Sequence, residues 1–304
     1  MERVNFYAGL ALDRMTERRS DSAWIESLFR NPNSRLIPVW RSRSLIREGA
    51  TPEAVFLSTS DLAVQNDTAM FLGLLGDAAY FATDISHVEE PALPDVVGGR
   101  GKFVDLRAVG AVMDRQHGGL LAYARGLAHW HSRHRFCGVC GAATVSAEGG
   151  HLRRCTNPAC AAEHFPRTDP AVIMLVTDGD RCLLARNGRF PLAMYSTLAG
   201  FVEPGESLEE AVTREVYEES QIRVTDVRYQ SSQPWPFPAS IMLGFRARAL
   251  TTDIKIDGTE LIDAGWFDRA QLRATHTHDP DKFRLPRGDS IARRLIEEWL
   301  AEGS

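Results

Sequence analysis

The most informative segment of the chain reads Gly200-Phe-Val-Glu-Pro-Gly-Glu206-Ser-Leu-Glu-Glu-Ala-Val-Thr-Arg214-Glu215-Val-Tyr-Glu218-Glu219-Ser-Gln-Ile222. It holds seven acidic residues among 23. Ser207 followed by Glu210 forms a capping box, in which each side chain bonds the backbone amide of the other residue. This pattern predicts that a helix begins at Leu208.

Two acidic residues of this helix fall on its apolar side. At about 100° per residue, Glu215 and Glu219 lie within the arc of Ala211, Val212 and Val216. Carboxylates one turn apart on a core-facing surface lose hydration and repel each other. A hard cation such as Mg²⁺ would neutralise them. The alternative, a solvated acidic face, would place both glutamates on the polar side, where Glu209 and Glu210 lie instead.

Arg214 stands one turn after Glu210 and one turn before Glu218. Pairs at this spacing are neighbours on a helix surface. We therefore expect Arg214 to brace the helix or the preceding loop through ion pairs rather than to act in catalysis.

Cysteine spacing predicts a metal site. Cys137, Cys140, Cys155 and Cys160 form a C-x2-C-x14-C-x4-C pattern. Four thiolates satisfy Zn²⁺ fully and leave no position for water, so the site is expected to be structural. The alternative is four unrelated buried thiols. Cys182, in an apolar run, is expected to be a core residue.

The acidic stretch resembles the Nudix box, G-x5-E-x7-R-E-U-x-E-E-x-G-U with U apolar. The matching residues are Gly200, Glu206, Arg214, Glu215, Val216, Glu218, Glu219 and Ile222. Gln221 departs from the pattern, which has a helix-ending glycine there, so a penalty of about 1 kcal/mol or a shifted helix end is expected. The resemblance implies hydrolysis of a nucleoside diphosphate linked to another moiety, with Mg²⁺ or Mn²⁺.

A second motif narrows the substrate. Ser232–Ser240 reads Ser-Gln-Pro-Trp-Pro-Phe-Pro-Ala-Ser, and its three prolines restrict the loop so that Trp235 and Phe237 are held for stacking or packing. The alternative is a stiff surface loop with buried aromatics. The motif resembles the S-Q-P-W-P-F-P-x-S signature of the NADH pyrophosphatase branch, which also has a zinc ribbon and an extra N-terminal domain. That branch implies hydrolysis of NADH or NAD to (reduced) nicotinamide mononucleotide and AMP, and removal of NAD caps from RNA.

The resemblance also implies roles for individual residues. Glu215 and Glu219 match metal ligands, Glu260 matches a third carboxylate, and Glu218 joins through water. Glu219 would orient or deprotonate the attacking water, with two or more metal ions bridging the phosphates. Taken alone, Glu260 is equally an exposed acid. Phe165 matches an aromatic that stacks on adenine. The dinucleotide pocket would be lined by Gln233, Pro234, Trp235, Pro236, Phe237, Pro238, Ala239, Ser240 and Ala292.

The expected fold is α+β, with an N-terminal Nudix-like domain, a zinc ribbon and a C-terminal α/β/α Nudix domain. Helical spacing over 105–134 predicts two helices with a break at Gly118-Gly119. A strand over Ala171–Val176 should pair with Cys182–Ala185, and a helix should cover Ser290–Leu300. The predicted domains are 1–104 (β-rich), 105–134 (helical linker), 135–167 (zinc ribbon) and 168–304 (catalytic).

Composition limits the class of protein. The chain has 304 residues, 44% hydrophobic and 25% charged, with a net charge of −5. These values are typical of a soluble globular protein and give no global attraction to nucleic acid. No apolar run is long enough for a membrane span, and we expect a cytoplasmic location. The branch is commonly homodimeric, so a homodimer is expected.

Two other functions are compatible with the sequence. One is a Nudix enzyme acting on ADP-ribose or a dinucleoside polyphosphate. The other is a catalytically silent RNA-binding or regulatory protein that uses the ribbon. His129, His131 and His134, with Arg133 and Arg135, are expected to form a solvated helix end, or alternatively a basic strip for RNA phosphates.

Overall fold

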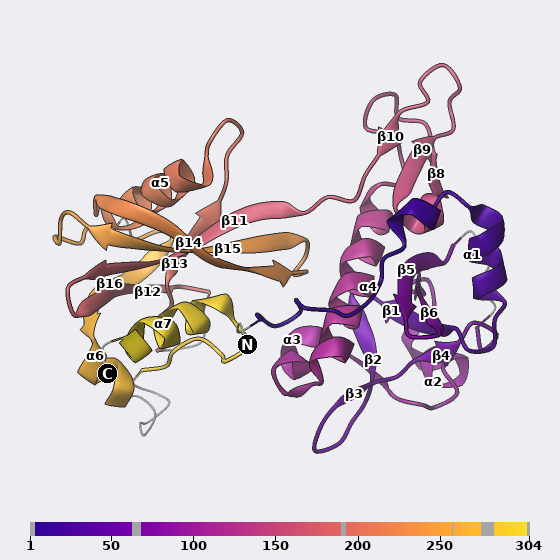
Figure 1. Cartoon of the computed structure of the whole chain (residues 1–304), viewed down its shortest axis with the longest axis horizontal. Coiled ribbons are helices and arrows are strands. Elements are labelled where there is room, and N and C mark those ends of the chain that lie inside the picture. The colour runs from indigo at the N-terminus through magenta and orange to yellow at the C-terminus, as the bar shows by residue number, and fades with distance from the viewer. Residues whose placement is uncertain (1–3, 63–67, 190–192, 257, 275–282, 303–304) are drawn as a thin grey trace. The chain divides into compact units, whose positions relative to one another are not determined.

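The contacts of the computed structural model divide the chain into two compact units (Figure 1). The N-terminal unit comprises Phe6–Thr168 and Trp235–Ala239, and the C-terminal unit comprises Met1–Asn5, Asp169–Pro234 and Ser240–Ser304. The structure describes residues 4–62, 68–189, 193–256, 258–274 and 283–302. Each unit is therefore discontinuous in sequence, and the proline-rich motif is divided between them.

A mixed sheet forms the centre of the N-terminal unit, with strand order β3-β2-β1-β6-β5 and with β4 on β1 and β7 on β2. Its strands are β1 (Arg35–Trp40), β2 (Arg43–Arg47), β3 (Glu53–Ala54), β4 (Leu57–Ser58), β5 (Met70–Leu75), β6 (Ala78–Asp84) and β7 (Lys102–Val104). The side chains of β1 pack in two hydrophobic cores, one on each face of the sheet. Ile37 and Val39 belong to one core, and Leu36 and Trp40 belong to the other. This alternation follows from the pleat of a strand.

Helices cover this sheet, and the longest described helix, α4, belongs to the same core as Ile37. The helices of the N-terminal unit are η1 (Thr16–Arg18), α1 (Ser22–Phe29), η2 (Glu90–Ala92), α2 (Leu93–Val96), α3 (Leu106–Val109), η3 (Gly110–Val112), α4 (Arg115–Arg133) and η4 (Glu148–Gly150). The residues for which the sequence predicts a helical linker pack within this unit.

The predicted helix break at Gly118-Gly119 is wrong. Both glycines are buried inside α4, and the break lies before it, where the Asp114 side chain caps the helix by accepting from the amides of residues 116 and 117. Gly119 faces the N-terminal segment, and a Cβ there would lie at an ordinary van der Waals distance of 3.4 Å from Leu10 Cδ1. Burial of this face of α4 in the core therefore outweighs the low helix propensity of glycine.

The zinc ribbon is a small antiparallel sheet of order β10-β9-β8. Its strands are β8 (Thr144–Ala147), β9 (Leu152–Cys155) and β10 (Glu163–His164). The four predicted cysteines lie in the turns and at the strand end of this sheet, as the hairpin-length spacing between the two pairs indicates.

The C-terminal unit is an α/β/α sandwich, as predicted. Its sheet has the order β14-β15-β11-β12-β16 with β13 on β11, and Figure 1 shows α5 and α7 on its two faces. The elements are β11 (Asp169–Asp178), β12 (Arg181–Asn187), β13 (Leu198–Phe201), α5 (Leu208–Ser220), β14 (Val224–Trp235), β15 (Ser240–Ala249), β16 (Leu261–Asp268), α6 (Arg269–Ala274) and α7 (Ile291–Glu302).

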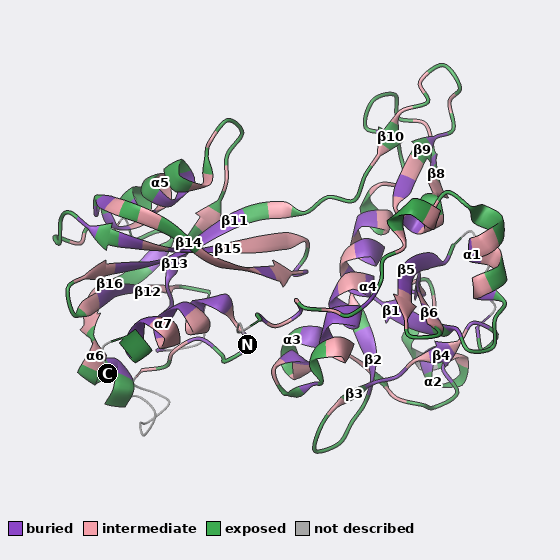
Figure 2. Ribbon diagram, viewed as in Figure 1, coloured by how far each residue is buried: buried purple, intermediate pink, exposed green. Residues whose placement is uncertain are grey.

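The central strand β11 connects the two layers of core. Val172 and Met174 pack in the core that contains α5, whereas Ile173 and Leu175 pack in the core that contains α7. Figure 2 shows part of β11 in the colour of buried residues. The predicted hairpin is confirmed, because Val176 on β11 pairs with Leu183 on β12. No helix within the described ranges is both long and apolar enough to cross a membrane.

Candidate active site

Helix α5 begins at Leu208, as predicted. The Ser207 side chain accepts from the Glu210 amide, and the Glu210 carboxylate accepts from the Ser207 amide at 2.7 Å. The apolar side of α5 packs against the sheet, while Glu209 and Glu210 are exposed. Acidic groups in this first turn also interact favourably with the helix dipole.

Glu215 lies against strand β13. Its side chain is 14% exposed, and a Cβ atom on Gly200 would lie 1.8 Å from its carboxyl carbon. Gly200 pairs with Val172 on β11, which fixes its position in the sheet. Only a residue without a side chain at position 200 leaves room for the Glu215 carboxylate. The first glycine of the box is therefore required by the position of Glu215.

The surroundings of Glu215 disfavour its charged form. Burial raises its pKa, Arg214 opposes this rise, and the negative charges of Glu218 and Glu260 add to it. The effect of Glu260 is informative, because this exposed residue follows β15 far along the chain and still influences Glu215. The third carboxylate implied by the resemblance is thus within electrostatic reach of the box.

The other box acids differ in exposure. Glu219 is partly buried, with its Oε2 atom shielded from solvent, whereas the Glu218 side chain is 57% exposed. The carboxylates of Glu215, Glu218, Glu219 and Glu260 are not gathered as the cysteines are: among the described residues, only the cysteine cluster has three or more ligand atoms within 4.8 Å of one another. Their oxygen donors suit a hard divalent cation.

Arg214 ties the helix to the loop before it. Its Nη2 donates to the Phe201 carbonyl at 2.8 Å and to Glu206 at 2.9 Å, and its Nη1 donates to Glu215 and Glu218. The hydrogen bonds from Arg214 hold the pKa of Glu206 at about 2. The predicted bracing role of Arg214 is confirmed, and its partners in the loop extend beyond those that helix spacing alone suggests.

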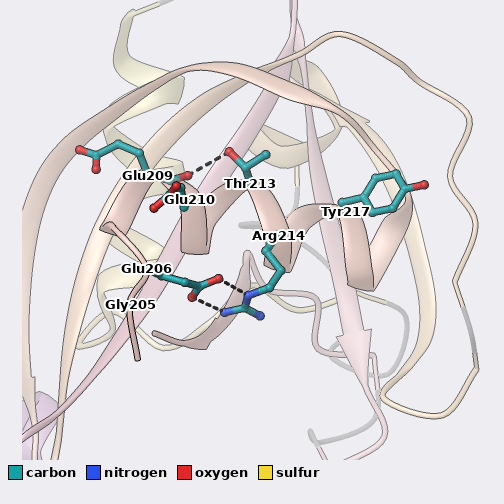
Figure 3. Close-up of a pocket in the computed structure, with 7 residues that line it drawn as sticks. All are labelled: Gly205, Glu206, Glu209, Glu210, Thr213, Arg214 and Tyr217. Carbon is teal, nitrogen blue, oxygen red and sulfur yellow. Dashed lines mark hydrogen bonds and ion pairs between the residues drawn. The ribbon is translucent and has the colours of Figure 1, made fainter. Parts of the chain in front are cut away.

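An open pocket lies on the outer side of α5 (Figure 3). The figure shows the Glu206 carboxylate facing the Arg214 guanidinium, with Glu209 directed away from it. The pocket is lined by Gly205, Glu206, Glu209, Glu210, Thr213, Arg214 and Tyr217. Glu215 and Glu219 do not line it, because positions 213 and 215 are roughly 200° apart around a helix.

Gln221 ends α5 in the conformation that the box glycine would adopt. Its φ is 58° and its amide donates to the Tyr217 carbonyl at 2.7 Å. The helix end therefore keeps its left-handed geometry, and the next residue, Ile222, remains fully buried. The substitution is accommodated by local strain and not by a shift of the helix end.

Gln233 of the proline-rich motif is buried, and it bonds the backbone at the start of α7. Its Nε2 donates to the Asp289 carbonyl at 2.7 Å, and its Oε1 accepts from the Ile291 amide at 2.8 Å. Ala292 follows in α7 and is 3% exposed. These bonds bring the beginning of the motif and the beginning of α7 together.

The middle of the motif packs in the N-terminal unit. Pro236 and Phe237 are buried, Trp235 is partly buried and Pro238 is exposed. Sequence reasoning missed the residue that holds them, Arg125 on α4, whose Nε donates to the Pro236 carbonyl at 2.8 Å. A charged residue inside an apolar helical stripe was the available signal. Phe165, which follows β10, is 65% exposed.

The cysteine site fits a zinc ion. The four sulfur atoms lie within 4.8 Å of one another, with Cys137 and Cys160 at 3.8 Å and Cys140 and Cys155 at 3.4 Å. A tetrahedron with Zn–S bonds of about 2.3 Å has sulfur atoms about 3.8 Å apart. Backbone amides lower the pKa of the Cys137 and Cys140 thiols to about 7. Cys182 lies elsewhere, fully buried as predicted.

His131 and His134 are not free at a solvated helix end, whereas Arg133 and Arg135 are exposed, as expected of one. His131 bonds the Gly150 carbonyl at 2.7 Å and Arg153 at 2.9 Å, and burial lowers its pKa to about 4. His134 bonds the Trp130 carbonyl at 2.8 Å. The contacts of His131 join α4 to the ribbon, so the expectation is corrected for these two histidines, which are partly buried and hydrogen-bonded within the protein.

Three family models match the chain in succession. An NADH pyrophosphatase-like rudimentary NUDIX domain matches residues 33–130, an NADH pyrophosphatase zinc ribbon domain matches 132–165, and a NUDIX domain matches 167–287. Their order is that of the sheet, ribbon and sandwich described above.

Known relatives span most of the chain. The human NAD-capped RNA hydrolase NUDT12 is 33% identical over 341 residues, covering 97% of this chain and 73% of that protein. The NAD-capped RNA hydrolase NudC of Mycobacterium bovis is 39% identical over 269 residues, covering 86% and 84%. The protein of the same name from Pseudomonas syringae pv. syringae is 48% identical over 185 residues, covering 61% and 62%. The chain therefore belongs to the Nudix hydrolase superfamily, in the NADH pyrophosphatase branch with a zinc ribbon.

Proposed function

We propose that this chain hydrolyses the pyrophosphate bond of NADH and NAD to (reduced) nicotinamide mononucleotide and AMP, and removes NAD caps from RNA. The observation that carries the proposal is the Gly200–Glu215 contact, which holds a partly buried carboxylate of the Nudix helix against the sheet. The names of the human and mycobacterial relatives favour NAD-linked substrates over other nucleotides.

The proposed chemistry is attack of water on one phosphorus atom. The new P–O bond forms as the bridging P–O bond breaks, and each mononucleotide leaves with its own phosphate. Glu219 would accept the proton of the attacking water, because its carboxylate is partly buried on the same helix as Glu215. Glu215, Glu219 and Glu260 would hold Mg²⁺ or Mn²⁺, with Glu218 joining through water. A bound divalent cation supplies Lewis-acid stabilisation of the charge on the diphosphate.

The proposed dinucleotide site uses the residues implied by the branch. Phe165 is exposed and so available to stack on adenine, with stacking worth about 1–3 kcal/mol per base. Gln233 to Ser240 and Ala292 would line the pocket. Because both polar ends of Gln233 bond backbone atoms, its contribution would be to hold the pocket in shape. We further propose a homodimer in the cytoplasm, with zinc only in the ribbon.

Comparison of substrates tests the function. Purified protein with Mn²⁺ or Mg²⁺ would be incubated separately with NADH, NAD⁺, ADP-ribose and NAD-capped RNA, and products identified by mass spectrometry. We expect AMP and nicotinamide mononucleotide from NADH and NAD⁺, and 5′-monophosphate RNA from capped RNA. A clear preference for ADP-ribose would show that ADP-ribose, and not NADH, is the substrate. Absence of hydrolysis of every nucleotide, with RNA still bound, would support the silent RNA-binding alternative.

A matched pair of variants connects this activity to the Nudix helix. Glu215→Gln should remove a ligand at the partly buried site, whereas Glu209→Gln changes an exposed acid of the same helix. Hydrolysis should fall sharply for the first variant only. Equal activities of the two variants would show that the reaction occurs elsewhere.

A further inference from the structure

The buried part of the proline-rich motif is held by two arginines of the N-terminal unit. Arg125 on α4 donates from Nε to the Pro236 carbonyl at 2.8 Å, and its guanidinium carbon lies 4.9 Å from the centre of the Phe237 ring. Arg107 lies 4.7 Å from the same ring centre and donates to the Phe237 carbonyl at 3.3 Å. Two cations thus contact a single aromatic ring of the loop.

Aromatic neighbours complete the enclosure of Phe237. The Tyr7 ring meets it edge-on at 6.0 Å, and the Trp235 ring meets it edge-on at 5.0 Å. Prolines before and after Phe237 restrict the backbone on both sides. The side chain is 8% exposed, so the loop conformation is coupled to the core of the N-terminal unit.

Arg125 is not expected to stabilise the fold, because its guanidinium is buried and incompletely paired. It is 9% exposed, its Nη1 has no hydrogen-bond partner among the described residues, and the nearest carboxylate, that of Asp105, is 3.8 Å away and half-exposed. Burial lowers its pKa accordingly. Apolar residues of similar volume commonly stabilise such positions as well or better. The Arg125 side chain instead donates its hydrogen bond to the motif loop, at the Pro236 carbonyl, which indicates a role there.

We propose that Arg125 is a positioning residue for substrate binding: by holding Pro236 and Phe237 it sets the conformation of the motif loop and thereby the affinity for the dinucleotide. The proposal rests on the function proposed above, in which this loop lines the pocket. Arg125 acts through the loop and touches no reacting atom. Its loss therefore raises KM far more than it lowers kcat.

Three variants of the full-length protein test this role. Arg125→Met keeps the volume of the stem and removes the guanidinium. Arg125→Lys keeps the charge but lacks the Nε–H donor directed at Pro236, and it supplies a second probe if the methionine variant does not fold. Leu120→Ala, a fully buried change in α4 within the same core, is the control for general destabilisation.

The first measurement is hydrogen–deuterium exchange of the peptide covering 233–240 without substrate. Exchange should be faster in both Arg125 variants and near native in Leu120→Ala. The second is steady-state hydrolysis of NADH with Mn²⁺. Because a hydrogen bond from a charged donor is lost, KM should rise about 10–100-fold in Arg125→Met, with kcat within about threefold of native and an intermediate rise in Arg125→Lys.

Several outcomes overturn the proposal. Native exchange rates in the 233–240 peptide of both Arg125 variants would show that Arg125 does not hold the loop. Faster exchange with native KM would show that the held conformation is irrelevant to binding. A rise in KM of the same size in Leu120→Ala would assign the effect to general destabilisation. Failure of native protein to hydrolyse NADH would refute the proposed function and the substrate role of Arg125, while the exchange data would still decide whether Arg125 holds the loop.

Discussion

Gly200 on β13 and Glu215 on α5 are in direct contact: a Cβ atom at Gly200 would lie 1.8 Å from Glu215 Cδ and 2.0 Å from its Oε1. The requirement for glycine here is one of space. Gly200 lies in a regular strand paired with β11, outside the left-handed region where backbone strain would select glycine. The strand therefore determines where the Glu215 carboxylate is held.

Gly200→Ala should displace the Glu215 carboxylate and reduce hydrolysis. A misplacement of about 1 Å in a catalytic arrangement reduces the rate about 10²-fold, and we expect kcat/KM for NADH to fall by this order. Gly188→Ala is the control, since the added Cβ would meet Ile262 at an ordinary 3.6 Å. Equal activity of the two variants would contradict the importance of the contact.

Glu219→Gln should strongly reduce turnover without changing the fold. General acid–base groups contribute about 10²–10⁴-fold to rates, so the loss should lie in this range. Circular dichroism and zinc content should remain native, because Glu219 is remote in sequence from the ribbon cysteines. Native turnover in the glutamine variant would refute the role proposed for Glu219 as base.

Cys155→Ser should release zinc from the ribbon. One thiolate of a closed four-ligand site is removed, and such sites contribute directly to folding. The zinc content measured by metal analysis should fall from one ion per chain towards zero. The three remaining ribbon thiols should then react with a thiol reagent. The control variant Cys182→Ala, changed in the core of the C-terminal unit, should retain the ribbon zinc. Full zinc content in Cys155→Ser would exclude Cys155 as a ligand.

Gln221→Gly should stabilise the C-terminal unit. A residue with a side chain at φ 58° is strained by about 1 kcal/mol relative to glycine. The midpoint of urea unfolding should therefore rise, while Gln221→Ala, which keeps the strain, should unfold near the native midpoint. A lower midpoint for the glycine variant would mean that the Gln221 side chain makes a stabilising contact that outweighs the strain.

Local patterns predicted the elements of the site well. The capping box at Ser207 placed the start of α5, and the helical wheel separated the exposed Glu209 from the partly buried Glu215. Both depend on interactions within one or two helical turns, which sequence spacing expresses directly. The same locality explains why cysteine spacing located the ribbon cluster.

The predicted helix break at Gly118-Gly119 was wrong because contacts between distant segments, which sequence spacing does not express, decide the structure there. Glycine propensity is a local property, but Gly119 lies against Leu10, more than a hundred residues earlier in the chain. Contacts between distant segments can outweigh a propensity of about 1 kcal/mol. Similarly, His131 was expected at a solvated helix end and is instead hydrogen-bonded to Gly150 and Arg153.

Residue type and spacing are enough to assign the family, the order of the domains, the box acids and the zinc cysteines. Three contacts become evident only in the folded chain: Glu215 rests on Gly200, Gln233 bonds the start of α7, and Arg125 bonds the proline-rich loop. The reason is physical: each of these contacts joins residues on different elements, and the distance between them is set by how strands and helices pack, which no local spacing records.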